Sequence, residues 1–395
     1  MATGQLVFAQ LMSLLPWTSF DRLVKLHRAD HKVQRFSCRD QFYAMAFAQL
    51  CARQSLRDIE VNLAARRSDL YRMGFRCTAV ARNTLAHANA TRPWQLYADF
   101  CRVLIDQALP LYAQEPLGLD LRGAKVFALD SSTLELCLSL FGWAAHRPTK
   151  ATVKLHTLLD LQGNIPCFVH VTEGSVGDRV AIDQILASGW VLPGAYYVMD
   201  RGYVDYARLA QLDQRGAFFV IRAIDNMRFE RTASAQLQVL ARQAGVQADD
   251  VGWLARPIAR QRYAQRLRRV IVHDELGREL VLLTNQLELP SHTVAALYKK
   301  RWQVELFFKW IKQHLRIKSF LGTSANAVKT QIWIALSVYL MCAIAKKRLN
   351  LHAHSLHDML RVIELNLFEP VAMTALLSRL PTEPSLQSAL QSELF

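Results

Sequence analysis

The stretch Leu297–Leu315 reads LYKKRWQVELFFKWIKQHL and has the length of one helix of about five turns. At about 100° per residue, one narrow stripe of that helix collects polar and charged side chains. The members of the stripe are Tyr298, Arg301, Glu305 and Lys312, with Lys309 at its border. Apolar residues flank the stripe on both sides, nearly the reverse of an ordinary surface helix. We therefore expect a helix packed on most sides, with its polar stripe facing a cavity or a ligand.

A carboxylate flanked by Arg, Lys and Tyr suits two tasks, which are holding a divalent metal ion and gripping phosphate. The alternative is a buried ion-pair network in which Glu305 merely neutralises Arg301 or Lys312. The stripe holds three cations and one phenol against a single acid. This excess of positive charge favours a phosphate partner.

The composition also indicates a polyanionic partner. The 395 residues include 48 Lys and Arg against 33 Asp and Glu, which gives a net charge of +15. Such an excess in a large globular chain is typical of proteins that bind nucleic acid or anionic lipid. Because 51% of the residues are hydrophobic, the chain can bury more than one core, and two or three domains are expected.

A membrane span and a disulfide framework are not expected. The longest mainly apolar run, residues 332–345, is shorter than the roughly 20 residues that span a bilayer, and it is expected to form a buried helix. The seven cysteines are scattered and have no C-x-x-C spacing, so they predict neither disulfides nor a zinc site. We therefore expect a cytoplasmic protein.

Residues 1 to about 115 are predicted to be helical throughout. Ser55 begins a helix as a capping box with Asp58, and Gly74 is suited to end it. Helices over 78–90 and 94–112 follow. The first two helices could form a helix-turn-helix that enters the major groove, and a plain helical bundle with a basic face is the alternative. The candidate DNA-contacting residues are Arg76, Thr78, Arg82, Asn83 and His87.

From residue 125 the pattern changes to short apolar runs typical of strands. The predicted strands are 125–130, 152–159, 165–171, 195–199 and 217–221, with helices at 178–187 and 206–214. This order predicts an α/β fold with a mixed sheet and helices on its faces. Asp130 and Asp200 each follow a strand, at the position where sites of open α/β sheets form. A lone Asp there is usually a turn or cap residue, but two of them followed by Glu305 on a helix are more specific.

Three carboxylates without a Cys or His cluster predict a site for Mg²⁺, with Mn²⁺ as a substitute. Two such ions about 3.5–4 Å apart activate an oxygen nucleophile and stabilise the leaving oxygen in phosphoryl transfer. Other acids are less well placed to converge with Glu305. These rivals are Asp160, Glu173, Asp178 and Asp205.

Residues 223–290 are predicted to interrupt the sheet as an arginine-rich, β-rich insertion. Trp253 in this insertion either stacks on an unstacked base or is a packed aromatic side chain. Residues 320–367 are predicted to be helical, mostly apolar, and to cover the sheet. The tail from residue 368 carries little signal.

The Y-(2)-R-(3)-E-(6)-K spacing of the stripe resembles the signature of one branch of bacterial insertion-sequence transposases, the fourth insertion-sequence family. The D-S-S/T context of Asp130 and the D-R-x-Y context of Asp200 and Arg201 are similar to this family as well. FSCRDQF at Phe36–Phe42 and SLRDIE at Ser55–Glu60 resemble its amino-terminal domain. The resemblance spans nearly the whole chain and is strongest from Asp130 to Lys312.

This resemblance implies a DDE transposase with a ribonuclease-H-like core. Asp130, Asp200 and Glu305 would hold two metal ions, with Asp130 bridging both. Tyr298, Arg301, Lys312 and the neighbouring Lys309 would hold phosphate at the cut end. The implied division is a helical DNA-binding domain (1–115), the core (116–222 and 291–367), the insertion (223–290) and a tail (368–395).

The implied partners are double-stranded DNA, as terminal inverted repeats and as target, and a second copy of the chain on paired ends. Arg201 and Trp253 would be further DNA contacts. The implied reaction is cut-and-paste transposition with 3′ nicking and strand transfer. Two alternatives stay open, namely a DNA-binding regulator derived from a transposase and a ribonuclease-H-like nuclease that cleaves without joining.

Overall fold

The computed structural model describes residues 4–147, 150–274, 276–314, 320–351 and 354–378. The chain forms two compact units. Unit 1 consists of residues 1–112, 134–152 and 308–394, and unit 2 consists mainly of residues 113–133 and 153–307. These units are defined by compactness and not by function, so the predicted boundaries of the functional domains stay a prediction.

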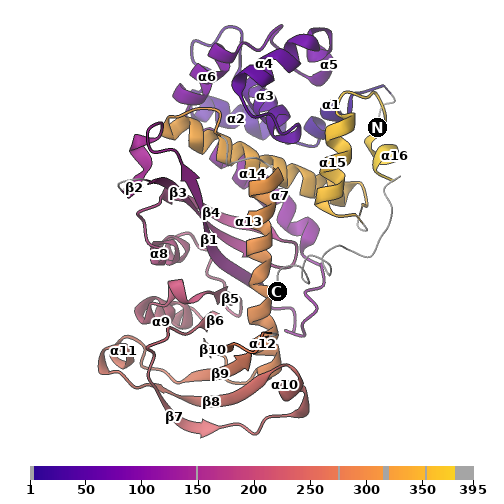
Figure 1. Cartoon of the computed structure of the whole chain (residues 1–395). Coiled ribbons are helices and arrows are strands. Elements are labelled where there is room, and N and C mark those ends of the chain that lie inside the picture. Colours follow the sequence, from indigo (N-terminus) through magenta and orange to yellow (C-terminus); the bar gives the residue numbers. More distant parts are fainter. Residues whose placement is uncertain (1–3, 148–149, 275, 315–319, 352–353, 379–395) are drawn as a thin grey trace. The chain divides into compact units, whose positions relative to one another are not determined.

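The amino-terminal part of unit 1 is helical, as predicted (Figure 1). The capping box of Ser55 and Asp58 is formed, and Gly74 ends a helix at a φ of 99°. The helix predicted over 78–90 begins at Arg82 rather than Thr78, which leaves Thr78 in a loop. The helices are α1 (Val7–Ser13), α2 (Trp17–Leu26), α3 (Cys38–Leu50), α4 (Leu56–Ala65), η1 (Arg67–Asp69), α5 (Leu70–Met73), α6 (Arg82–Thr91) and α7 (Gln95–Tyr112).

Helix α14 (Ala325–Arg348) forms the centre of unit 1 and packs against α7, α6 and α3. It is long and apolar enough to cross a membrane by length and composition, but 94% of that apolar window is buried inside the protein. Within unit 1 its main packing partners are helices, and the prediction that this segment covers the sheet stays a prediction. A helix that is apolar all round needs cover on every side, and the bundle supplies it. The helices α15 (Leu356–Asn366) and α16 (Met373–Leu377) complete the described part of the unit.

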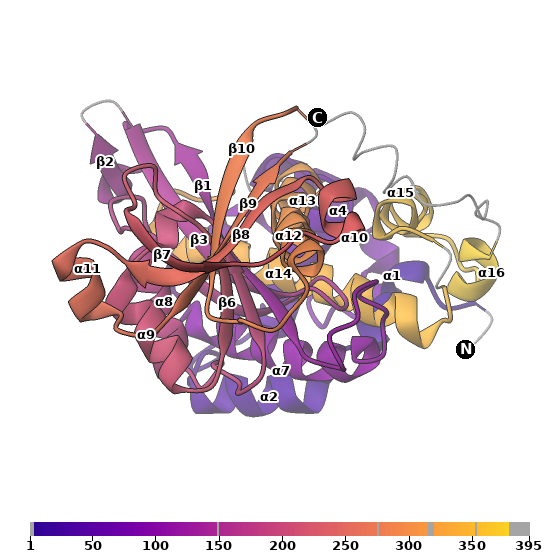
Figure 2. The same cartoon turned by 90° about the horizontal axis from the view of Figure 1, so that it is seen from below.

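Unit 2 is built on a mixed sheet, as predicted (Figure 2). The strand order is β2-β3-β1-β5-β6-β10-β9-β8-β7, and β4 pairs with β3. β1, β5 and β6 are parallel to one another, whereas β3 and β4 are antiparallel. The strands are β1 (Val126–Leu136), β2 (Ala145–Arg147), β3 (Lys150–Asp160), β4 (Ile165–Glu173), β5 (Tyr196–Met199), β6 (Phe218–Arg222), β7 (Phe229–Ser234), β8 (Val246–Leu254), β9 (Leu267–His273) and β10 (Glu279–Thr284). The short β2 belongs to unit 1.

Helices connect and cover these strands. The predicted helix over 206–214 is found with the same bounds, and α9 and α12 both pack against β6. The helices between and after the strands are η2 (Gly142–Ala144), α8 (Arg179–Ala187), η3 (Arg201–Tyr203), α9 (Tyr206–Gln214), α10 (Val239–Gln243), α11 (Pro257–Arg262), α12 (Ser291–Lys300) and α13 (Trp302–His314).

The segment over 223–290 extends the sheet instead of interrupting it, which corrects the prediction. β10 pairs antiparallel with β6, and β9, β8 and β7 follow in order. Strand β6 would otherwise end the sheet with unpaired N–H and C=O groups, and β10 satisfies them. Two of its arginines are structural, since Arg268 pairs with Asp249 at 2.7 Å and Arg269 with Asp250 at 2.6 Å.

The predicted helix over 297–315 is divided at Arg301. α12 ends at Lys300 and α13 begins at Trp302. The Arg301 N–H donates to the Tyr298 carbonyl at 3.0 Å, and the Val304 N–H donates to the Arg301 carbonyl at 3.1 Å. These bonds span three residues, so a tighter turn joins the two helices. Residues 315–319 lie outside the described residues.

Candidate active site

The two predicted aspartates lie side by side because of the strand register. β1 and β5 are parallel neighbours, and Leu129 is paired with Met199. Asp130 and Asp200 are the next residues along these strands. β1 continues through Asp130, whereas the chain after Asp200 turns into η3. Two residues that are 70 positions apart in the sequence thus meet at the carboxyl ends of neighbouring paired strand segments.

Arg301 links Asp130 to Glu305. Its Nη1 donates to Asp130 Oδ2 at 3.0 Å, and its Nη2 pairs with Glu305 Oε1 at 2.7 Å. The Arg301 and Asp130 side chains are 13% and 18% exposed, and Glu305 is 34% exposed. The ion pair predicted as the alternative for Glu305 therefore exists, but it includes a second carboxylate from the sheet.

Tyr298 connects the same helical segment to the third carboxylate. Its hydroxyl donates to Asp200 Oδ1 at 3.2 Å, and its ring lies 5.6 Å from the Arg301 guanidinium carbon. Tyr298 and Arg301 together contact all three predicted acids. The polar stripe of the sequence thus faces Asp130 and Asp200, as expected of a helix whose polar side points into a site.

The electrostatics of the site reflect burial first, and then the negative charge that is concentrated there. Burial raises the pKa of Asp130 to about 6, against the lowering effects of Arg301 and the Ser131 N–H, and the carboxylates of Glu305 and Asp200 raise it further. Burial also works against the charge of Arg301, but Tyr298, Glu305 and Asp130 outweigh it and raise the pKa of Arg301. Burial is the main cause that raises the pKa of Tyr298 to about 12.

The donor set fits a hard divalent cation in its chemistry, since it consists of carboxylate oxygens. Within the described residues, no group of three or more His, Cys, Asp or Glu side chains is arranged to hold a metal ion. Arg301 lies between Asp130 and Glu305 instead. A cation could reach both carboxylates after the guanidinium has moved.

The remaining members of the predicted stripe lie further along α13. Lys309 and Lys312 are half-buried, and both belong to unit 1. Their contact with phosphate stays a prediction.

Asp178, one of the acids set aside, forms a polar cluster next to the predicted aspartates, since the buried Tyr203 lies near Asp130, Asp178 and Asp200 alike. The Ser131 hydroxyl donates to Asp178 Oδ1 at 2.7 Å, and Lys154 Nζ donates to the same oxygen at 3.0 Å. His156 Nδ1 is 3.9 Å from it. Ser131 directly follows Asp130 in β1, so this cluster adjoins the predicted aspartates. The Lys154–His156 alternation was the available sequence signal for this cluster.

The candidate DNA-contacting residues of the helical region are exposed. Arg82 and Asn83 begin α6, and His87 lies one turn further along it. Glu60 accepts the Arg82 N–H at 3.0 Å and so caps this helix. Arg76 and Thr78 lie in the preceding loop, and the choice between a helix-turn-helix and a plain helical bundle stays a prediction.

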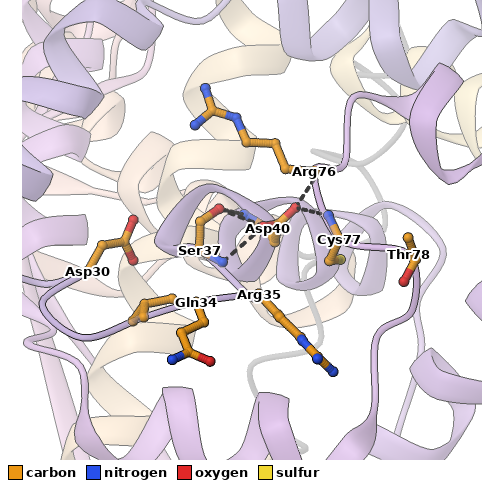
Figure 3. A pocket seen from close by; sticks show the side chains of 9 residues that line it. Asp30, Gln34, Arg35, Ser37, Asp40, Arg76, Cys77 and Thr78 are labelled. Carbon is orange, nitrogen blue, oxygen red and sulfur yellow. Dashed lines mark hydrogen bonds between the residues drawn. The ribbon is translucent and has the colours of Figure 1, made fainter.

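A cavity of about 470 Å³ opens beside that loop, at the start of α3 (Figure 3). Asp40 holds the loop in place, because its carboxylate accepts the N–H groups of Arg76 at 2.7 Å and Cys77 at 3.3 Å. The Ser37 hydroxyl caps α3 by accepting the Asp40 N–H, and the Ser37 N–H donates to the other oxygen of Asp40 at 2.9 Å. The cavity is lined by Asp30, Val33, Gln34, Arg35, Ser37, Asp40, Arg76, Cys77 and Thr78.

Two further candidates lie in unit 2. The Arg201 side chain is 47% exposed and pairs with Asp225 at 3.0 Å. Trp253 is half-buried on β8, with the guanidinium groups of Arg260 and Arg266 at 5.0 and 5.8 Å from its ring. This packing agrees with the structural alternative for Trp253, and base stacking stays a prediction.

Two family models match the sequence. Residues 121–341 match a model described as "Transposase DDE domain", which spans more than half of the chain. Residues 3–76 match a model described as "Domain of unknown function (DUF4372)". The first match contains Asp130, Asp200 and Glu305.

Three similar proteins are named as transposases. One from Sinorhizobium fredii is 32% identical over 263 residues, which are 67% of this chain and 71% of that protein. A transposase for an insertion sequence element of Geobacillus stearothermophilus is 31% identical and is matched over 54% of each chain. One from Synechocystis is 24% identical over 55% of this chain and 59% of that protein.

Among solved structures, the piggyBac transposase synaptic complex with hairpin DNA has a TM-score of 0.46 and 10% identity to this chain. The alignment covers 98% of this chain and 82% of that chain, but a likeness this remote says nothing of function. The sequence matches show the family without this structural likeness. The chain belongs to the DDE-domain transposases of bacterial insertion sequences.

Proposed function

We propose that this chain cleaves DNA at the ends of an insertion sequence and joins those ends to a target, with divalent metal ions as cofactors. The observation that carries the proposal is the convergence around Arg301. Asp130 and Asp200 directly follow the last paired residues of the parallel strands β1 and β5. Arg301, from the helical segment, joins Asp130 to Glu305. This convergence supports the three carboxylates as the catalytic acids.

Asp130, Asp200 and Glu305 would hold Mg²⁺, or Mn²⁺ as a substitute, through their oxygens. When bound, two such ions supply activation of a water or 3′-hydroxyl and stabilisation of the leaving oxygen. Asp130 would hold the ions together with Glu305 and Asp200, whose carboxylates are near enough to raise its pKa. The protein's own task is to position these acids and the DNA phosphate, and to stabilise the charge that develops during the reaction.

Tyr298, Arg301, Lys309 and Lys312 would bind phosphates of the DNA end. The guanidinium of arginine matches phosphate oxygens as a planar fork of donors, and lysine adds a point charge. Tyr298, Arg301, Glu305 and Lys312 have the Y-R-E-K spacing. This spacing supports membership of the fourth insertion-sequence family.

The sheet order β4-β3-β1-β5-β6, with β1, β5 and β6 parallel, supports a ribonuclease-H-like core. In this proposal residues 1–115 bind the terminal inverted repeats, and Trp253 of the insertion and Arg201 of the core contact the DNA end. The net charge of +15 supports a DNA partner. We propose a homodimer on paired ends, acting in the bacterial cytoplasm at the nucleoid.

The test is cleavage of a labelled duplex that carries the DNA flanking the gene, in Mg²⁺ or in EDTA. The wild type is compared with Glu305→Gln and with Glu288→Gln, which removes the same charge from an exposed position. We expect nicking at the element boundary that EDTA abolishes, that Glu305→Gln lowers by about 10³-fold or more, and that Glu288→Gln leaves unchanged.

The alternatives give other results. Cleavage without joined products in the presence of a target plasmid would identify a nuclease. Binding of the duplex without cleavage by any of the three proteins would identify a DNA-binding regulator. Equal cleavage by the wild type and Glu305→Gln would overturn the assignment of Glu305.

A further inference from the structure

Arg301 occupies the space between two carboxylates that the proposed function assigns to metal ions. One of its terminal nitrogens contacts Asp130 and the other contacts Glu305, at 3.0 and 2.7 Å. The side chain is largely buried, and its Nε has no hydrogen-bond partner in the described part of the chain. Two of its three nitrogens therefore contact acids, and the N–H of the third, Nε, is unsatisfied.

A guanidinium and a divalent cation compete for the same two carboxylates. Both are positively charged, and in a partly buried site their repulsion is screened much less than in water. A buried arginine that has lost its carboxylate partners also needs another anion. Metal binding between Asp130 and Glu305 thus requires a new partner for Arg301.

A phosphate diester of DNA is the partner that fits. Its oxygens accept a bidentate pair of N–H donors from arginine, and the unsatisfied Nε offers one of the two. The Tyr298 ring, 5.6 Å from the guanidinium carbon, lines the same face of the site. Asp130, Asp200 and Glu305 outnumber Arg301 in charge, so a cation that enters is still attracted after the guanidinium has left.

We propose that Arg301 keeps divalent metal ions out of this site in the absence of DNA, and that a DNA phosphate draws Arg301 away from Asp130 and Glu305. Metal and DNA then bind cooperatively, because each favours the same position of one side chain. The inference rests on the proposed function of the three carboxylates. It goes further in making DNA binding a condition for tight metal binding, so that the protein does not load metal away from its substrate.

The experiment measures Mn²⁺ binding to the full-length protein by the EPR signal of unbound Mn²⁺, with and without a duplex carrying the element end. The variants are Arg301→Gln and, as a matched control, Arg208→Gln, whose guanidinium pairs with Asp183 and Asp205 instead. The double variant Asp130→Asn/Glu305→Gln gives the background of Mn²⁺ bound by DNA and by other acids.

Without DNA, we expect Arg301→Gln to bind Mn²⁺ about tenfold more tightly than the wild type and Arg208→Gln. Addition of DNA should raise the affinity for Mn²⁺ about tenfold in the wild type and in Arg208→Gln, and by less than twofold in Arg301→Gln. If Arg301→Gln does not fold, as judged by its circular dichroism, Arg301→Lys replaces it. Lysine cannot donate to both acids as a planar fork. Arg301→Lys should therefore also bind Mn²⁺ more tightly than the wild type without DNA, by a smaller factor than Arg301→Gln.

Two results would contradict the proposals, and they differ. Equal Mn²⁺ affinity of Arg301→Gln and the wild type without DNA, both above the double-variant background, would overturn the role of Arg301 and leave the metal site standing. Binding at background level in all proteins, with and without DNA, would overturn the metal site and with it the proposed function.

Discussion

At the scale of single residues, the polar cluster around Asp178 is the least expected part of the site. His156 has no exposed surface, and its Nδ1 has no hydrogen-bond partner among the described residues. Burial lowers the pKa of His156 to about 4, although Asp178 opposes this, and the nearby charges of Lys154 and His170 lower it further. The ring is therefore neutral in the folded protein at neutral pH.

This neutral histidine predicts acid sensitivity. Between pH 6.5 and about 4, the unfolded chain binds a proton at His156 and the folded chain does not, so the stability falls as the pH falls. Between pH 7 and pH 5 the wild type should lose about 2 kcal/mol more than His156→Gln. Urea unfolding at both pH values measures this difference. His273→Gln, at an exposed position, should behave as the wild type does, and a similar loss in His156→Gln would refute the assignment.

At the scale of elements, the strands of the insertion depend on close backbone approach. Gly252 on β8 is paired with Arg231 on β7. A Cβ at this glycine would lie 2.0 Å from the Glu230 carbonyl oxygen and 2.9 Å from a ring carbon of Phe229. Backbone on one side and an aromatic ring on the other leave no room for a methyl group.

Gly252→Ala should therefore separate β7 from β8 and destabilise the insertion by about 1–3 kcal/mol. Hydrogen exchange followed by mass spectrometry should show faster exchange in β7 and β8, with unchanged protection in β1 and β5. Gly142→Ala is the matched control, because a Cβ at Gly142 meets nothing within 4 Å. Unchanged exchange in β7 would show that the two strands can accommodate the methyl group.

At the scale of the whole molecule, the net charge of +15 is the property that bears most directly on DNA. Part of this charge is neutralised locally, as Arg268 and Arg269 show by their pairs with Asp249 and Asp250. Other arginines of the insertion, on and before α11, are exposed. These are Arg256, Arg260 and Arg262.

If these exposed arginines contact DNA phosphates, Arg256→Gln combined with Arg262→Gln should weaken binding and lower the slope of log K against log salt concentration by about 2. Fluorescence anisotropy of a labelled duplex between low and physiological salt measures the slope. Arg268→Gln should act through stability instead, because its loss leaves Asp249 buried without a cation. An unchanged slope in the double variant would exclude the α11 region from the DNA interface.

The sequence by itself determined the local features of this protein. The capping boxes of Ser37 and Ser55, the stop at Gly74 and the bounds of α9 depend on residues a few positions away, which can be seen in the chain. The strand end before Asp200 and the helical position of Glu305 were predictable for the same reason, whereas β1 continues past Asp130 to Leu136, beyond its predicted end. Their roles in catalysis stay predictions.

Tertiary structure decided how these elements combine. An apolar helix such as α14 can cover a sheet or fill a bundle, and an edge strand such as β6 accepts any strand with a matching edge. Arg301 likewise could have faced phosphate or solvent, and only the meeting of β1 with α13 gave it two carboxylates. Periodicity and capping report on neighbours along the chain. The choice of a distant partner depends on which surfaces and charges remain unsatisfied after the chain has folded.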